Sequence, residues 1–194
     1  MDPHKIRIML WNAQSIYSTG TFGEFQKTVE ETKPNVICIV ETWLNPDKNL
    51  KLNGFQVFRK DRDANGGGIA ILTRLELDAK SLNIPNINNG IPIVEHLGIS
   101  ITFNNSPLNI ITFYNPHGNN GNNELCNEMN HYMSGIRGKT ILCGDFNARH
   151  PTWDTNGTNP AGNDLYRFIS TARQLSLLTP RDLGTRKNFR GNGD

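Results

Sequence analysis

Apolar residues recur along the chain in short runs separated by polar and glycine-rich stretches. The runs are rich in Ile, Val, Leu and Phe, and they predict strands at residues 5–11, 35–41, 55–59, 68–74, 94–103, 108–114 and 139–143. The run at 35–41 is continuously apolar between its polar ends, as expected of a strand that is buried on both faces. Most of the chain is therefore expected to form sheets.

Three segments instead place their apolar side chains at helical spacing, which predicts helices over residues 21–32, 125–136 and 163–175. Thr21 and Glu24 fit a capping box at the start of the first helix, and Pro34 follows its end. Asn163 is a candidate N-cap of the third helix. Paired strands with a few helices predict an α+β fold, a two-sheet β-sandwich flanked by helices.

Composition narrows the class of protein only modestly. A chain of 194 residues with 36% hydrophobic and 20% charged residues suits one domain, and a formal charge of +2 is too small to indicate a nucleic-acid partner by itself. No apolar stretch is long enough for a signal peptide or a membrane span, which predicts a nuclear or a cytoplasmic protein without a membrane partner. The three cysteines lack zinc-site spacing and are expected to be buried thiols.

Polar clusters follow the predicted strands at the points where the strands end. They are Asn12-Ala13-Gln14-Ser15, Glu41-Thr42-Trp43, Tyr114-Asn115-Pro116 and Gly144-Asp145-Phe146-Asn147. Loops at the ends of buried strands are where a rigid scaffold displays reactive groups, so these clusters are the candidate site.

The chemistry of these clusters suits a phosphate and a hard cation. Glu41 ends a buried run, where a carboxylate is costly unless it is exposed or has a partner such as Mg²⁺; taken alone, it also fits an ordinary exposed carboxylate. Asp145 and Asn147 would project to the same side of an extended backbone, although Gly-Asp-Phe-Asn equally fits a turn. Asn12 offers an amide and Tyr114 a hydroxyl donor.

The order and content of the clusters resemble the endonuclease/exonuclease/phosphatase family, and within it the endonucleases of non-LTR retrotransposons, especially the jockey-like elements. The matching stretches cover nearly the whole chain, at residues 10–15, 40–44, 66–71, 114–116 and 144–153. The Ala-Arg-His-Pro-Thr-Trp continuation at 148–153 favours the retrotransposon group over abasic-site nucleases and lipid or inositol phosphatases of the same fold. The glycine run at 66–68 precedes a strand and lacks a P-loop lysine, so it does not indicate a phosphate loop.

The resemblance implies a four-layer, DNase I-like sandwich whose site lies at the strand-end loops. It implies that Glu41 is the main ligand of Mg²⁺, with Mn²⁺ as the alternative ion, and that Asn12 lies beside it at the metal. It further implies that Tyr114 contacts the phosphate, that Asp145 orients or activates the attacking water, and that Asn147 is its partner at the scissile phosphate. The implied reaction is hydrolysis of one DNA phosphodiester, leaving a 3′-hydroxyl that primes reverse transcription.

The resemblance also implies partners beyond the metal. DNA is the expected substrate, contacted by residues near and after the last cluster, namely Arg149, His150, Trp153, Thr185 and Arg186. The expected location is the nucleus, with the cytoplasm as the alternative, and the fusion partner is a reverse transcriptase that normally follows in the same polypeptide.

The family pattern ends with an aspartate in a late strand and a terminal Ser-Asp-His, and nothing after Thr185-Arg186 matches it. We therefore expect residues 1–194 to form one C-terminally truncated domain that lacks the last strands. Such a domain is expected to nick DNA poorly or not at all. The alternatives are a catalytically inactive DNA-binding relic and another phosphoesterase of the same fold.

Overall fold

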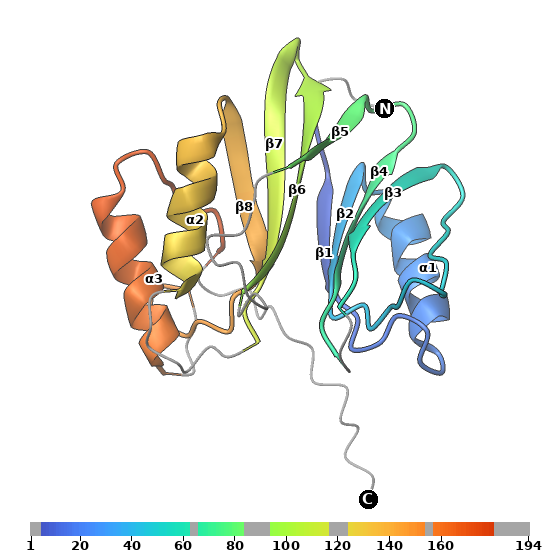
Figure 1. Ribbon diagram of the computed structural model, residues 1–194, viewed down its shortest axis with the longest axis horizontal. Coiled ribbons are helices and arrows are strands. Elements are labelled where there is room, and N and C mark those ends of the chain that lie inside the picture. The colour runs from blue at the N-terminus through green and yellow to red at the C-terminus, as the bar shows by residue number, and fades with distance from the viewer. Residues whose placement is uncertain (1–4, 63–65, 84–93, 117–123, 154–156, 181–194) are drawn as a thin grey trace, which may run out of the picture.

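The chain folds into two sheets that pack against each other, with helices on the outer face of each sheet (Figure 1). The computed structural model describes residues 5–62, 66–83, 94–116, 124–153 and 157–180. The elements are, in chain order, β1 (Ile8–Asn12), α1 (Thr21–Thr32), β2 (Val36–Val40), β3 (Phe55–Lys60), β4 (Ile69–Arg74), β5 (Ala79–Leu82), β6 (Glu95–Phe103), β7 (Ser106–Tyr114), α2 (Glu124–Gly135), β8 (Lys139–Asp145) and α3 (Pro160–Thr171).

Each sheet has four described strands and mixes parallel with antiparallel pairs. The first sheet has the order β1-β2-β4-β3, and the second has the order β5-β6-β7-β8. β1 is parallel to β2 and β7 is parallel to β8, whereas the other neighbouring strands are antiparallel. Parallel neighbours end at the same edge of a sheet, so each sheet presents one pair of carboxyl ends together.

The alternation of side chains along β2 shows why this strand is apolar throughout. Ile37 and Ile39 belong to the cluster that includes Phe25 of α1. Val36 and Cys38 point the other way, into the core between the two sheets. Every residue of β2 is buried, which confirms the prediction of a strand covered on both faces.

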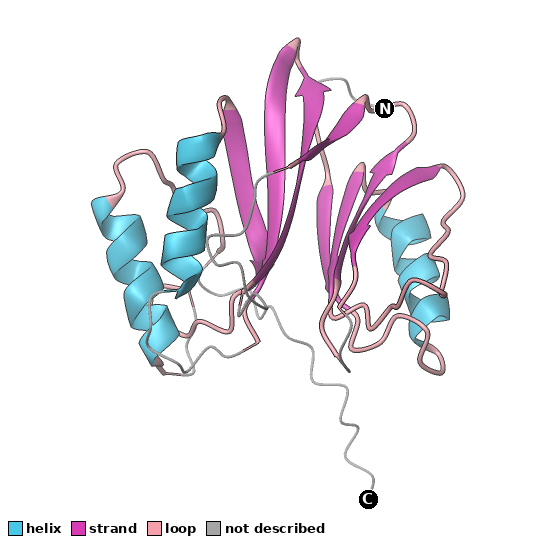
Figure 2. Cartoon of the chain, viewed as in Figure 1, coloured by secondary structure: helices cyan, strands magenta, loops and turns pink. Residues whose placement is uncertain are grey.

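The second sheet repeats this arrangement with its own helices. Ile110 faces the core between the sheets. Ile111 and Phe113 lie in a separate cluster with Met129 of α2 and Leu165 of α3. The order helix, sheet, sheet, helices confirms the predicted four-layer sandwich, and Figure 2 shows the helices as the outer layers.

Several local predictions are wrong. The N-cap of α1 is Gly20, and no side chain caps the helix, so the capping box of Thr21 and Glu24 does not form. The N-cap of α3 is Asn159 rather than Asn163, because the Asn159 side chain accepts a hydrogen bond from the N–H of Gly162. Strand β5 was not expected, since its short, partly exposed sequence lacks an apolar run.

Cys38 of the first sheet and Cys143 of the second meet between the two sheets, with 3.6 Å between their sulfur atoms. Both thiols and that of Cys126 are free, and Cys38 and Cys126 are buried. Within the described ranges, no helix combines the length and the apolar character needed to cross a lipid bilayer.

Candidate active site

The carboxyl ends of four strands, two from each sheet, carry the predicted site residues. Asn12 is the last residue of β1, and Glu41 directly follows β2. Tyr114 and Asp145 are the last residues of β7 and β8, and they lie opposite each other in the parallel ladder. The two edges face each other across the sandwich, as shown by hydrogen bonds from Asn12 to a residue of each sheet.

The Asn12 amide bridges the two carboxylates. Its nitrogen donates to Glu41 Oε1 at 2.8 Å and to Asp145 Oδ2 at 2.9 Å, the latter across 133 residues of sequence. Its oxygen accepts a hydrogen bond from the Gln14 N–H at 3.2 Å. Hydrogen bonds to ionised acceptors are stronger than neutral ones, so this one side chain fixes the relative position of both carboxylates.

The Tyr114 hydroxyl lies among negative charges. Burial raises the pKa of Tyr114 most, and the charge of Glu41, a hydrogen bond to Glu41 and the charges of Asp145 and Glu95 raise it further. The side chain is therefore a neutral phenol at physiological pH and can donate its proton to a bound oxyanion.

Asn147 joins the site by a different geometry from the one predicted. Strand β8 ends at Asp145, and Asn147 has a left-handed φ of 46°, so the two side chains do not share one face of an extended strand. Instead, the Asn147 N–H donates to Asp145 Oδ1 at 3.2 Å, and the Asn147 side chain donates to the carbonyl oxygen of Asn115 at 2.9 Å. The segment is thus both a turn and part of the candidate site.

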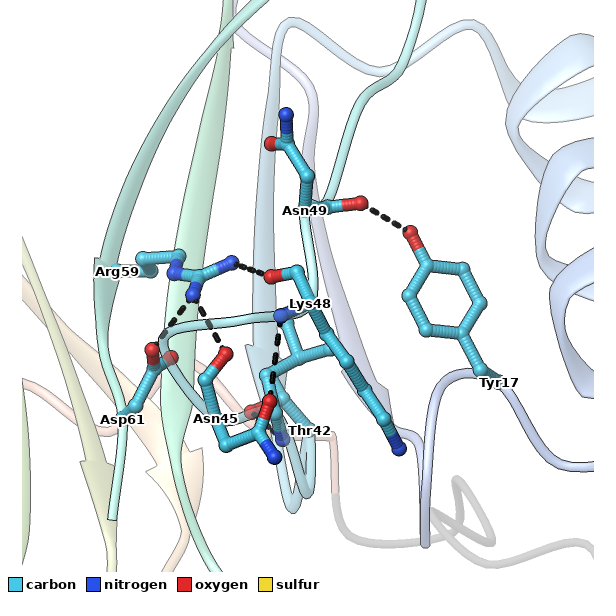
Figure 3. Close-up of polar contacts among 8 residues, drawn as sticks. Tyr17, Thr42, Asn45, Lys48, Asn49, Arg59 and Asp61 are labelled. Carbon is cyan, nitrogen blue, oxygen red and sulfur yellow. Dashed lines mark hydrogen bonds and ion pairs between the residues drawn. The ribbon is translucent and has the colours of Figure 1, made fainter. Parts of the chain in front are cut away.

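The loops after β1 and β2 are tied to each other and to β3 (Figure 3). The Tyr17 hydroxyl donates to the carbonyl oxygen of Asn49 at 2.7 Å. Arg59 donates to the carbonyl oxygens of Lys48 and Asn45 and pairs with Asp61. These contacts hold residues 45–49, the far part of the loop that begins at Glu41.

Glu41 itself lies in a strained segment. Glu41 has a φ of 54° and Trp43 has a φ of 52°, a left-handed conformation that bulky residues rarely adopt. The Trp43 side chain is 47% exposed although it is large and apolar. An exposed indole two residues from the central carboxylate offers a flat surface on which a nucleotide base could stack.

The described residues among the expected DNA contacts follow the last cluster. Arg149 is exposed, and its N–H donates to the Asn159 side chain at 2.9 Å. The His150 ring stacks on Tyr166 of α3 with 4.1 Å between ring centres. Trp153 is half-buried against the core of the helix layer, and its indole N–H donates to Ala148.

The contacts of Trp153 and His150 within the protein therefore anchor the loop, independently of any contact with DNA. Thr185 and Arg186, the remaining expected DNA contacts, lie outside the described residues.

The carboxylates suit a small, hard cation that takes only a few of its ligands from the protein. Within the described ranges, no group of three or more His, Cys, Asp or Glu side chains is gathered for a metal ion. Mg²⁺ is commonly held by one or two carboxylates, with water and phosphate completing its shell, so Glu41 alone would be enough to hold it and Asp145 would remain available to a bound water. The Asn12 nitrogen faces the carboxylates, so a ligand role for its oxygen requires the amide to rotate.

Asn115 and Asn159 help to build the site, although the sequence assigned neither of them a role there. Asn115 holds both sides of the Asp145 loop: its N–H donates to the carbonyl oxygen of Asp145, and its side chain donates to that of Phe146. Asn159 donates to the carbonyl oxygen of Asn147 at 2.7 Å while capping α3. The Asn-Pro pair at 159–160 is a recognisable signal for a turn into a helix, but Asn115 looks like any loop asparagine.

The sandwich, with acidic, amide and phenol groups at its strand ends, is the DNase I-like architecture. The sequence model of the Endonuclease/Exonuclease/phosphatase family matches residues 9–193. The chain belongs to this family.

A curated relative, a DNA-(apurinic or apyrimidinic site) endonuclease of Dictyostelium discoideum, is 26% identical over 177 residues. That match covers 84% of this chain but 47% of the relative, so the chain spans about half the length of the curated protein it matches.

Solved structures share the fold at low sequence identity. The endonuclease domain of TRAS1, a telomere-specific non-LTR retrotransposon, has a TM-score of 0.65 and 15% identity, over 86% of this chain and 70% of that one. The AP endonuclease LMAP from Leishmania major has a TM-score of 0.66 and 15% identity, over 88% and 68% of the two chains. At these identities the likeness establishes the fold alone.

Proposed function

We propose that this chain is a divalent-metal-dependent endonuclease that hydrolyses one phosphodiester bond of DNA. The observation that carries the proposal is the Asn12 bridge, which holds a carboxylate from each sheet at one exposed edge. Two carboxylates that face a common point repel each other, and a site that keeps them there is suited to a cation and a phosphate.

The residues divide the chemistry among them. Glu41 would hold Mg²⁺ or Mn²⁺, and the bound ion would neutralise charge on the phosphate and on the leaving oxygen. Asp145 accepts a hydrogen bond from the attacking water and receives its proton as the water oxygen bonds to phosphorus. The neutral Tyr114 hydroxyl donates to a phosphate oxygen, which stabilises the charge that builds there.

Asn12 and Asn147 position these groups. Asn12 keeps Glu41 and Asp145 in fixed relation, and the Asn147 N–H holds the other oxygen of Asp145. The P–O3′ bond breaks, the phosphate stays on the 5′ side of the nick with the oxygen of the attacking water, and the leaving oxygen takes up a proton from solvent water to become a 3′-hydroxyl.

The biological role that suits this product is the priming of reverse transcription in a non-LTR retrotransposon. The support is the resemblance of residues 144–153 to the retrotransposon endonucleases and the fold shared with the TRAS1 domain. The role would require DNA in the nucleus as substrate and a reverse transcriptase in the same polypeptide as partner.

A plasmid-nicking assay tests the proposal. The protein is used in excess over supercoiled plasmid with Mg²⁺ or Mn²⁺, so that slow cleavage is also measured. We expect nicking that EDTA abolishes and that Glu41→Gln and Asp145→Asn each reduce by about 100-fold or more. The matched controls are Glu76→Gln and Asp78→Asn, which alter exposed carboxylates between β4 and β5 and should nick like the wild type. Nicking that survives both site variants would refute the assignment.

A second candidate activity, incision at abasic sites, is favoured by the 26% identity to the Dictyostelium endonuclease. The same assay on duplexes with and without one abasic site separates the two activities. Cleavage confined to the abasic duplex would favour the repair-type activity, whereas comparable cleavage of both duplexes would favour the retrotransposon role.

A further inference from the structure

A buried carboxylate outside the candidate active site lies against the glycine run that precedes β4. Glu95, the first residue of β6, is only 6% exposed. Its Oε2 accepts a hydrogen bond from the Gly68 N–H at 2.7 Å, and its Oε1 accepts one from Arg62 at 3.2 Å. A buried carboxylate is costly unless such partners fill its lone pairs, so this placement calls for a reason.

The glycine run is shaped by side chains on both sides of it. A Cβ at Gly67 would lie 2.3 Å from Glu95 Oε1, and a Cβ at Gly68 would lie 2.5 Å from Thr42 Oγ1. Both glycines also have left-handed φ angles, +73° and +84°. Residues 67 and 68 are therefore glycines because the loop fits between Glu95 and Thr42.

The loop in turn holds the strained segment that contains Glu41. The Thr42 N–H donates to the carbonyl oxygen of Gly68 at 3.1 Å, and the Trp43 N–H donates to that of Gly67 at 2.9 Å. Left-handed conformations at Glu41 and Trp43 persist only if their surroundings enforce them. A continuous set of contacts thus runs from Glu95 through the glycines to the two residues that directly follow Glu41.

We infer that Glu95 is a positioning residue for Glu41: by holding the glycine loop, it keeps the Glu41 carboxylate where Asn12 and a metal ion meet it. The inference rests on the proposed function for its effect on catalysis, but its effect on the backbone is independent of that function. The hydrogen-bond acceptor of Glu95, rather than its charge, performs this role.

An alternative route from Glu95 to the site is electrostatic. Glu95 lies directly opposite Tyr114 in the antiparallel ladder of β6 and β7, and its charge contributes to the raised pKa of Tyr114. Glu95→Gln separates the two routes, because glutamine keeps an acceptor for the Gly68 N–H and removes the charge. Glu95→Ala removes both.

The test combines metal binding with catalysis. Binding of Mn²⁺ alone is measured by electron paramagnetic resonance, and nicking is measured under saturating Mn²⁺. We expect Glu95→Ala to weaken Mn²⁺ binding and to lower kcat by about 10-fold or more each, as losses around a metal ligand do. KM for DNA should stay within about twofold, because the substrate contacts are intact. Glu95→Gln should restore both quantities to within about threefold of the wild type.

A measurement that does not depend on catalysis distinguishes a failure of this inference from a failure of the proposed function. Amide hydrogen exchange of Thr42 and Trp43 reports their bonds to the loop directly, and we expect Glu95→Ala to accelerate it by about 10-fold or more. The exposed carboxylate variant Glu76→Ala is the control and should leave it unchanged. An accelerated exchange without any metal binding or nicking in the wild type would support the positioning role and overturn the nuclease.

Gly67→Ala provides an independent perturbation of the same contact, since its methyl group would displace the Glu95 carboxylate. Its effects on exchange and on Mn²⁺ binding should not add to those of Glu95→Ala in the double variant. Folded Glu95→Ala protein with wild-type exchange, Mn²⁺ affinity and kcat would overturn the inference. So would a Glu95→Gln variant as impaired as Glu95→Ala, because the charge would then be the operative property.

Discussion

Replacement of Gly162 by alanine tests how α3 is docked beside the site. Gly162 is the third residue of α3 and is buried. Helix propensity alone predicts that alanine stabilises the helix by up to about 1 kcal/mol. The surroundings of Gly162 predict the opposite sign.

The magnitude follows from one distance. A Cβ at Gly162 would lie 1.8 Å from the carbonyl oxygen of Arg149, whereas real Cβ contacts essentially never fall below 3.0 Å. Helix α3 and the Arg149 loop must therefore separate by at least 1.2 Å, the difference between those two distances. Such a shift also strains the Asn159 side chain, which accepts hydrogen bonds from both Gly162 and Arg149. Overpacking of this kind typically costs about 1–3 kcal/mol, so Gly162→Ala should lower the free energy of unfolding by about 1–2 kcal/mol.

Urea unfolding followed by circular dichroism measures the effect, and the chain offers a matched control. Gly23 is also the third residue of a helix, α1, and nothing lies within 4 Å of its Cβ position. Gly23→Ala should therefore leave the free energy of unfolding unchanged or raise it by roughly a few tenths of a kcal/mol. If Gly162→Ala proved as stable as the wild type, or more stable, the docking argument would be refuted.

Two further predictions concern polar side chains, one of them buried and the other at the start of α3. Burial, with a smaller contribution from Lys60, lowers the pKa of His96 from 6.5 to about 3. Between these values only the unfolded chain binds the proton, so the free energy of unfolding should fall as pH drops below about 6.5, by up to about 2 kcal/mol at about pH 5. Urea titrations of the wild type and of His96→Gln at each pH isolate the contribution of His96. Burial raises the pKa of Glu95, so Glu95 changes the stability in the opposite sense, but it does so in both proteins. Equal pH dependence of the two proteins would contradict the prediction. Asn159→Ala removes the α3 cap and the donor to Asn147, so it should cost about 1–2 kcal/mol in urea unfolding and slow nicking; an unaltered unfolding midpoint would count against the cap.

Much of the architecture was predictable because burial imposes a period on the sequence. The range predicted for α1 agrees with the structure, and the continuous apolar run of β2 indicated the layer between the helix and the second sheet. The missed strand β5 follows from the same physics: with half of its four residues exposed, its sequence carries no apolar run that periodicity could detect.

The candidate site was predictable in its parts but not in its geometry. Glu41 and Asp145 were recognisable because each carboxylate comes at the end of an apolar run of the sequence. Their connection through Asn12 depends on how two sheets pack, and no local pattern encodes a contact across 133 residues. Glu95 carried no signal, since a carboxylate at the first position of a strand looks like an ordinary edge charge until the glycine loop is seen against it.

The division of the site between two sheets has an energetic consequence. Glu41 is attached to the first sheet and Asp145 to the second, so repulsion between the carboxylates pushes the sheets apart at this edge. The apolar core between the sheets, which includes Cys38 and Ile110, resists that separation. The Asn12 amide lowers the repulsion by donating to both carboxylates, but an amide carries only a partial charge. A divalent cation would relieve more of it, so under the proposed function the packing that assembles the site would also strengthen metal binding.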